Sequence, residues 1–500
     1  MTNTQPQVRT YGNWRRPTTP GLLGLGTVGT IVLLVGLVAT VITVMFGGLI
    51  NGVIVFAIMA GFLFTVAVKD KHGQSALTRA TNRMNWMRAR SSGSNLYRSG
   101  PLGRTDWGTA QLPGLAAQSR LREYIDSYGR PFALIHVPST GDYTVVIGTE
   151  PDGAALVDQE QIDSWVADWG HWLRNLGDEA GVVAAAVTIE TAPDTGRRLR
   201  GEVNMNIDPE APAFAQAMLR EVVASYPSGS AAVRAYVSIT FTAATRANGR
   251  RRDSDEMGRE LAARLPGLTQ ALSATGAGAA RPLTAQQLCE VIRIAYDPEI
   301  AELIDDAHQS GERFELRWSD VGPSGAQASW DSYRHDSALS VSWQMTEAPR
   351  GVVQANILTR FLAPHRDIAR KRVTWLYRPI DVARAAAIVQ ADLRAANFNM
   401  TSSERPTARD VVGTRAAMAT AQEEANGAGL VNFGMVVTAT VTDPSRVADA
   451  KAAIENLSAT ARLRLRVVTG AQDSAFVAAL PLGIVLPKHL KLPTELRGAF

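Results

Sequence analysis

The residues that could carry out chemistry are few and scattered. The chain has seven His among its 500 residues, and their positions show no metal-ligand spacing such as H-E-x-x-H. Gly is never followed by Lys, so the G-x-x-x-x-G-K-[ST] loop that cradles phosphates is absent. His365-Arg366-Asp367 matches the catalytic tripeptide of protein kinases, but the downstream D-F-G and the Gly-rich loop are missing. We therefore expect no enzymatic activity, no metal and no cofactor.

Two basic clusters are the remaining candidates for binding. The first, Arg246 with residues 250–252, lacks interleaved aromatic side chains for base stacking and is followed at once by acidic residues. This pattern favours a solvated loop. The second cluster could contact a nucleotide-bearing partner or DNA, so direct nucleic-acid binding stays open; it comprises Arg366, Arg370, Lys371 and Arg372.

An uncharged, mostly apolar stretch of 48 residues runs from Gly21 to Val68. A single helix of that length would reach roughly 72 Å, about twice what a bilayer core requires. The sequence therefore predicts a transmembrane hairpin with spans at about 21–45 and 49–68. We assign its turn and its packing to small and turn-forming residues, namely Gly47, Gly48, Asn51 and Gly52.

Basic residues flank this segment on both sides, and Asp70 is the only acidic residue before position 103. Because positive flanks stay in the cytoplasm, we expect a two-pass protein of the plasma (inner) membrane with both termini cytoplasmic. The apolar run is too long for a cleaved signal peptide, and the single cysteine, Cys289, agrees with a cytoplasmic domain. The residues expected at the membrane interface are Trp14, Arg15, Arg16, Lys69, Lys71, Arg79 and Arg83.

The remaining elements indicate an α/β (α+β) cytoplasmic region. Residues 1–20 form a tail, and residues 69–114 form a basic exit helix and a linker rich in Gly, Ser and Pro. Two sandwich-like units follow, at 115–320 and 326–500, each with a long helix between two strands. Residues 158–176 are expected to form an amphipathic helix whose tryptophan stripe packs into a core. The similar element order suggests an internal duplication without a residue-level repeat.

Two parts of the chain resemble components of actinobacterial conjugative elements. The amino end, with its lead Tyr11-Gly-Asn-Trp-Arg-Arg-Pro17, two adjacent spans and a basic exit helix, is similar to the small PrgI-type membrane subunit of type IV secretion systems. The region from about Leu115 to Leu486 looks like the amino-terminal domain of the secretion ATPase, including the segment Phe476-Val-Ala-Ala-Leu-Pro-Leu-Gly483. In that ATPase, such a proline-containing exit leads into the motor domain, which this sequence lacks.

The resemblance implies a non-enzymatic inner-membrane scaffold that docks a secretion or conjugation ATPase and other membrane subunits. The membrane segment would contact lipids, and the protein is expected to form a homo-oligomer. Three alternatives stay open at this point: a type VII secretion membrane component, a membrane-tethered enzyme of unknown substrate, and a DNA-binding membrane protein.

Overall fold

The computed structural model describes residues 9–12, 14, 26–68, 70, 72–103, 109–151, 153, 156–193, 197–225, 231–243, 251–311, 315–349, 351–401 and 407–490. The chain divides into two compact units, which are treated separately below. The first, called the body, comprises Met1–Gly12, Asn95–Ala391 and Met418–Val485. The second unit comprises Asn13–Ser94, Asp392–Ala417 and Leu486–Phe500.

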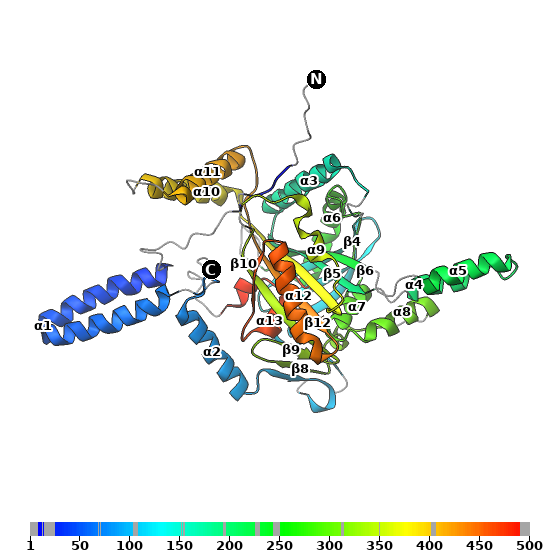
Figure 1. Cartoon of the computed structure of the whole chain (residues 1–500), viewed down its shortest axis with the longest axis horizontal. Helices are drawn as coiled ribbons and strands as arrows, with labels where there is room; N and C mark the ends of the chain where they lie inside the picture. The colour runs from blue at the N-terminus through cyan, green and yellow to red at the C-terminus, as the bar shows by residue number, and fades with distance from the viewer. Residues whose placement is uncertain are drawn as a thin grey trace, which may run out of the picture. The chain divides into compact units, whose positions relative to one another are not determined.

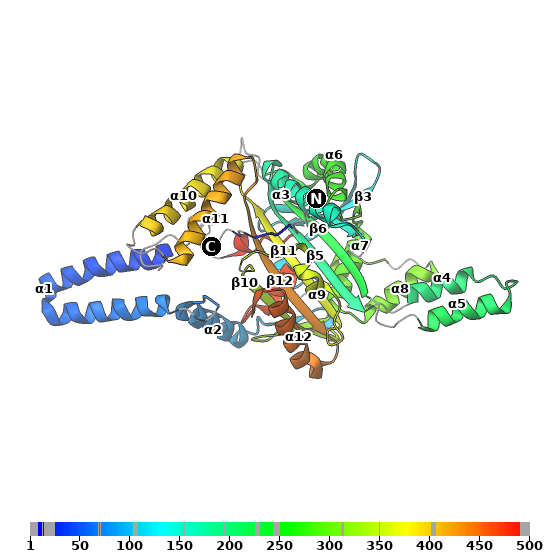
Figure 2. The same ribbon diagram turned by 45° about the horizontal axis from the view of Figure 1, so that its top comes forward.

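The body is built on one large antiparallel sheet, whose long central strands cross the middle of Figures 1 and 2. The strand order is β1-β8-β9-β10-β12-β11-β5-β6-β4-β3-β2, while β13 pairs with β10 and β7 pairs with β4. The strands are β1 Leu96–Arg98, β2 Arg120–Ile125, β3 Pro131–Val137, β4 Asp142–Glu150, β5 Val182–Pro193, β6 Ala231–Thr242, β7 Ala279–Pro282, β8 Gly325–Ala328, β9 Tyr333–His335, β10 Ala338–Glu347, β11 Arg370–Pro379, β12 Val431–Val441 and β13 Arg464–Val467.

The helices account for most of the rest of the described residues. They are α1 Gly26–Ala67, α2 Ala76–Ser91, α3 Gln159–Asp178, α4 Arg197–Asn206, α5 Ala213–Ser225, α6 Ser254–Ser273, α7 Ala285–Tyr296, α8 Ile300–Ser310, α9 Thr359–Leu362, α10 Val382–Thr401, α11 Ala408–Ala425, α12 Val447–Thr460 and α13 Gln472–Ala478. Two of them begin at capping boxes, where Asp253 and Glu256 cap α6, and Thr284 and Gln287 cap α7.

The prediction of two separate sandwich-like units is wrong. Strand β5, from the first predicted unit, pairs with β11, from the second, in a register that runs from Lys371 opposite Thr191 to Tyr377 opposite Ala185. The hydroxyl groups of Thr188 and Thr374 are hydrogen-bonded at 3.1 Å across this seam. Their mutual pairing has no local sequence signal, because β-pairing partners can be distant in the chain.

The two halves of the sheet nevertheless share one topology. Strands β2 to β7 of the first half correspond in order and pairing to β8 to β13 of the second. Each half also inserts a helical hairpin between its two central strands, α4–α5 between β5 and β6 and α10–α11 between β11 and β12. This correspondence supports an internal duplication, with β5 and β11 as the strands at which the halves meet.

One face of the sheet, called the apolar face, is covered by α3 and α6 in the first half and by α9 and α12 in the second. Side chains alternate between faces along each strand. On β4, Tyr143, Val145 and Ile147 therefore share a buried cluster with Trp172 and Leu176 of α3. The predicted core role of the tryptophan stripe is confirmed, since Trp172 and Leu176 are buried there.

The opposite face, called the hydroxyl face, carries buried Ser and Thr side chains on the central strands. Most of their hydroxyl groups satisfy one another or a backbone carbonyl, in keeping with the rule that buried polar groups find partners, although Oγ of Ser238 has none. Besides the pair at the seam, these contacts join Thr144 to Thr240 at 3.0 Å, Ser340 to Thr440 at 2.8 Å and Ser342 to Thr438 at 2.9 Å.

Residues 479–485, called the strap, leave α13 and run over the hydroxyl face from the second half to the first. Thr374 of β11 donates its hydroxyl to the carbonyl of Ala479 at 2.8 Å, and Thr240 of β6 donates to the carbonyl of Gly483 at 3.0 Å. The segment that resembles a motor-domain exit is thus packed inside the body, where Phe476 and Leu480 are almost fully buried.

The strap predicts a strict requirement for glycine at position 483. Gly483 has φ +65°, and a Cβ atom there would lie 2.4 Å from side-chain atoms of Thr144 and Thr240. We expect Gly483→Ala to lower the free energy of unfolding by about 2–4 kcal/mol, combining left-handed strain with overpacking. Urea denaturation of the detergent-solubilised chain, followed by tryptophan fluorescence, measures this loss.

Gly129→Ala is the matched control for Gly483→Ala. Gly129 has φ +78° but no atom within 4 Å of the added Cβ. The Gly129→Ala substitution should lower the free energy of unfolding by only about 1–2 kcal/mol, from backbone strain alone. Equal losses in the two variants would show that the strap does not pack tightly on the sheet.

The second unit contains α1, and here the predicted hairpin of two separate helices must be corrected. The structure has one helical element, Gly26–Ala67, and its portion Gly29–Ala67 is long and apolar enough to cross a membrane. The backbone leaves helical geometry only at Gly48 (φ 83°, ψ 166°). The other expected turn residues keep helical conformations around this kink, and the Asn51 side chain donates to the Gly47 carbonyl at 2.8 Å.

Candidate functional site

The structure describes only some of the predicted membrane-interface residues. Arg15, Arg16, Lys69 and Lys71 lie outside the described residues, and Trp14 is exposed. Arg79 and Arg83 lie on α2, which buries none of its residues. The guanidinium of Arg83 lies 5.3 Å from the centre of the Trp86 ring, and that of Arg90 lies 5.5 Å from it. The helix therefore presents cations and an aromatic ring at its surface, a combination suited to a membrane interface.

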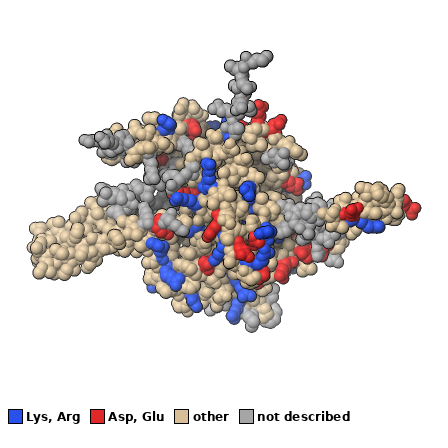
Figure 3. Space-filling model, in the orientation of Figure 1, with Lys and Arg blue, Asp and Glu red and all other residues tan. Residues whose placement is uncertain are grey.

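The predicted packing residues of α1 lie at its kink. Gly52 is buried, and a Cβ atom at this position would lie 2.2 Å from Cγ2 of Val44. Beyond the kink, the side chain of Met59 packs against Gly36, where a Cβ would lie 2.2 Å from the sulfur atom. Small residues thus permit close approach within α1. Figure 3 shows α1 as a surface without Lys, Arg, Asp or Glu.

The second basic cluster does not form one surface. Arg366 is exposed, but the other three residues lie on β11 and their side chains are largely buried. Lys371 faces the apolar face, where its ammonium donates to the Ala363 carbonyl and lies 5.9 Å from the centre of the Phe361 ring. Burial lowers the pKa of Lys371 to about 8.

Arg370 and Arg372 face the opposite side of the sheet and converge on Glu190 of β5. Nε and Nη2 of Arg372 donate to one Glu190 oxygen at 3.0 and 2.8 Å, and Arg370 donates to the other. Burial alone would raise the pKa of Glu190, but the positive charges of Arg370 and Arg372 outweigh it and lower the pKa to about 2. This cluster joins the two halves of the sheet by ion pairs from which water is largely excluded.

A cavity of about 720 Å³, called the body pocket, opens beside this cluster. Its walls are the ends of β4, β5 and β6 together with β7, α7 and α8, and Arg370 reaches it from β11. A volume of this size is typical of small-molecule sites. The polar side chains that line it include Glu190, Arg234, Tyr236, Asp305, His308 and Arg370.

The pocket lies where buried polar groups are incompletely satisfied. Among the described residues, Nε of Arg370 and Nη1 of Arg372 are buried without a hydrogen-bond partner. Burial and the charge of Glu190 raise the pKa of Tyr236 to about 12, so its phenol stays protonated at neutral pH. The pocket therefore combines the guanidinium groups of Arg234 and Arg370 with the protonated phenol of Tyr236. Sequence reasoning missed Glu190 and Tyr236, although an acidic residue inside an otherwise apolar strand was an available signal.

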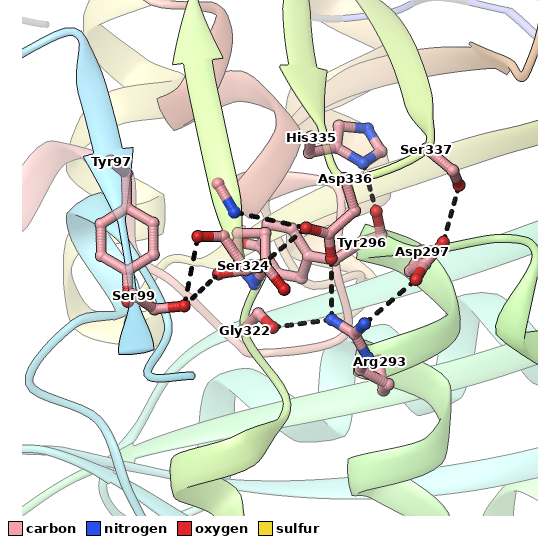
Figure 4. Close-up of polar contacts among 12 residues, drawn as sticks. Tyr97, Ser99, Arg293, Tyr296, Asp297, Gly322, Ser324, His335, Asp336 and Ser337 are labelled. Atoms are coloured by element: carbon pink, nitrogen blue, oxygen red, sulfur yellow. Dashed lines mark hydrogen bonds and ion pairs between the residues drawn. The ribbon is translucent and has the colours of Figure 1, made fainter. Parts of the chain in front are cut away.

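A second polar cluster fixes the junction between the halves (Figure 4). Arg293 of α7 donates to the Gly322 carbonyl at 2.7 Å and pairs with Asp336 at 2.9 Å and Asp297 at 3.0 Å. Asp336 also accepts a backbone hydrogen bond from Ser324 at 2.7 Å. The segment 322–325, which falls between the two predicted units, is therefore held at the end of α7.

His335 lies at the same junction and is fully buried. Its Nδ1 faces the Tyr296 carbonyl, which can only accept, so Nδ1 carries the proton. Its Nε2 then accepts from Ser340, whose oxygen lies 2.7 Å away. The neutral ring is thus satisfied at both nitrogens, and burial lowers the pKa of His335 to about 4.

Comparison with known proteins identifies one family match. A family described as a domain of unknown function (DUF8461) matches residues 18–78, the stretch that contains α1 and the start of α2. No curated protein matches the chain. The match is confined to the second unit.

The Glu190 cluster predicts an acid-sensitive seam. The folded-state pKa lies below the value of roughly 4.3 expected in the unfolded chain, so the stabilisation is complete above that pH. It falls by about 3 kcal/mol as pH drops from 4.3 to 2. We expect Glu190→Gln to cost about 3–5 kcal/mol at pH 7, because two buried cations lose their partner, and to cost progressively less below pH 4.3. Urea denaturation across this pH range measures both effects.

Glu347→Gln is the control for Glu190→Gln. Glu347 pairs with Arg464 at 3.5 Å, and both side chains are partly exposed. Removing such a surface pair should cost less than about 1 kcal/mol. A loss of similar size in both variants would contradict the seam role of Glu190.

His335 predicts a second, higher pH window. Its folded-state pKa of about 4 is below the value of roughly 6.5 expected when unfolded, so the unfolded chain binds more protons between these values. Stability should therefore fall by about 3 kcal/mol as pH drops from 6.5 to 4. In His335→Asn this part of the decline should be absent, leaving only the smaller contribution of groups such as His136, whose pKa is also lowered by burial, whereas exposed His171→Asn should retain it. An unchanged pH profile in His335→Asn, measured by urea denaturation, would refute the assignment.

Proposed function

We propose that this protein is a non-enzymatic, membrane-anchored scaffold of a type IV secretion or conjugative DNA-transfer machine. In this proposal α1 anchors the chain and the body docks a cytoplasmic ATPase that supplies the nucleotide chemistry. The observation that carries the proposal is the presence, in one chain, of a membrane-length apolar helix and a folded body with an exposed apolar helical hairpin.

The body is placed on the cytoplasmic side in this proposal. Helix α2 follows α1 and carries four Arg and no acidic residue, the charge bias typical of a cytoplasmic flank. The only cysteine, Cys289, is buried on α7 and makes no disulfide, which suits a reducing compartment. Anionic headgroups would pair with the exposed arginines of α2.

The α4–α5 hairpin is the docking surface that we favour. Figures 1 and 2 both show it extending outward from the sheet, and Figure 2 shows its two helices side by side. Phe214, Met218 and Val222 recur every four residues on α5 and are exposed, Phe214 to 76%. Leaving such a stripe in water forgoes about 1.5–3 kcal/mol per large side chain. A stripe of this kind commonly marks a protein interface.

The hairpin assignment predicts loss of ATPase docking on polar substitution. The triple variant Phe214→Gln, Met218→Gln and Val222→Gln removes the apolar stripe while keeping residues that favour helix. We expect affinity capture of the detergent-solubilised variant from its host to recover at least about tenfold less secretion ATPase than the native chain. Quantitative mass spectrometry of the captured proteins is the measurement.

Glu221→Gln, on the same helix, is the control and should leave capture unchanged. A triple variant that captures as much ATPase as the native chain would reject the α4–α5 surface. A native chain that captures no secretion or conjugation subunit would reject the scaffold function itself.

A further inference from the structure

We propose that the body pocket binds a small molecule through an oxyanion, a phosphate or carboxylate group seated against Arg370 and Arg234. This site is independent of ATPase docking, because the lining residues of the pocket do not include α5.

The first argument is the presence of unsatisfied buried donors. Arg370 lines the pocket with only 11% of its side chain exposed, and its Nε has no partner among the described residues. Behind it, Nη1 of Arg372 is likewise unpartnered, and only 2% of that side chain is exposed. A buried donor without a partner costs about 1–3 kcal/mol, more when it is charged. Because Arg370 lines the pocket, a small shift of its side chain toward a bound acceptor would expose Nε and remove this cost.

The second argument is the local charge balance. Glu190 carries one negative charge, whereas Arg370 and Arg372 together carry two positive charges. The buried cluster therefore has a net charge of +1. Arg234 adds a further cation to the same pocket, next to the phenol of Tyr236. Guanidinium groups hold phosphates and carboxylates through paired N–H donors. Carboxylates at Glu150 and Asp305 also line the pocket, which favours a ligand with one anionic group over a polyanion.

The third argument is size. A cavity of about 720 Å³ is far larger than a bare phosphate or acetate ion requires. Pockets of roughly 300–1,000 Å³ usually enclose most of a drug-sized molecule. The oxyanion would therefore be one end of a larger ligand, whose remainder contacts apolar residues of the pocket such as Leu283 and Ile294.

Calorimetric titration of the detergent-solubilised full chain with inorganic phosphate, and separately with acetate, tests the proposal. Ionic strength is held constant with NaCl, so that only specific binding contributes. We expect saturable binding of at least one of the two anions. Arg370→Gln should weaken it at least about tenfold, since a charge-assisted hydrogen bond is lost. If neither anion binds saturably to the native chain, the proposal is wrong.

Two further variants keep the test decisive if Arg370→Gln fails to fold. Arg234→Gln removes a more exposed cation of the pocket and should also weaken binding, whereas Arg366→Gln, an exposed arginine outside the pocket, should not. Equal affinities in the two variants would overturn the site. Glu190→Gln should bind the anion more tightly and gain more thermal stability from it than the native chain, because the anion replaces the missing carboxylate. A purely structural cluster would show no such gain.

The same chemistry could come from a soluble metabolite or from a lipid headgroup. Repeating the phosphate titration in nanodiscs of phosphatidylglycerol and of phosphatidylcholine distinguishes them. Weaker apparent phosphate binding in phosphatidylglycerol alone would identify a competing anionic headgroup. Equal binding in both would identify a water-soluble ligand.

Discussion

The body depends on the ion pairs that Glu190 makes with Arg370 and Arg372 across the β5–β11 seam. Without that seam the two halves would be separate sheets, each with an unpaired central edge. A buried carboxylate is costly on its own, and two guanidinium groups offset the cost only where the strands align in one register. The cluster can therefore specify which strands meet and how, while apolar residues on the same strands supply most of the burial.

The strap adds a second constraint on the same seam. Its carbonyl groups accept hydrogen bonds from hydroxyl groups on β11 and on β6. One segment of chain is therefore hydrogen-bonded to both halves of the sheet. A hydroxyl-lined face needs such acceptors, because Ser and Thr donors buried against an apolar helix would go unsatisfied. Packing and polar satisfaction thus place the same demand on residues 479–485, which must cross close to the sheet with glycine at the tightest contact.

Local patterns predicted local structure well, and long-range pairing escaped them. The stripe on α3 was interpreted correctly because helical spacing reports burial directly. The two-unit division was wrong because a break rich in Gly and Pro at 322–325 looks the same whether it is free or pinned, as it is here by Arg293 and Asp336. The hairpin of separate helices was wrong because Gly47 and Asn51 are tolerated inside a helix as well as in a turn. The basic cluster was not one surface because residues 370–372 lie on a strand, in which alternate side chains face opposite sides of the sheet. Adjacent residues in the sequence therefore lie in different environments.

The internal repeat explains why the pocket lies in the first half. In the second half, α13 packs directly against β10 and β12, and Gln472 uses its side-chain amide to bond both the N–H and the carbonyl of Ser342. Its counterpart α7 packs instead against β2 and β3, nearer the sheet edge. The inner strands β4, β5 and β6 are thereby left with open space in front of them, which α8 closes from the side. In the second half, α13 thus fills the space over the hydroxyl face. In the first half, the corresponding space remains as the body pocket, next to the Glu190 cluster.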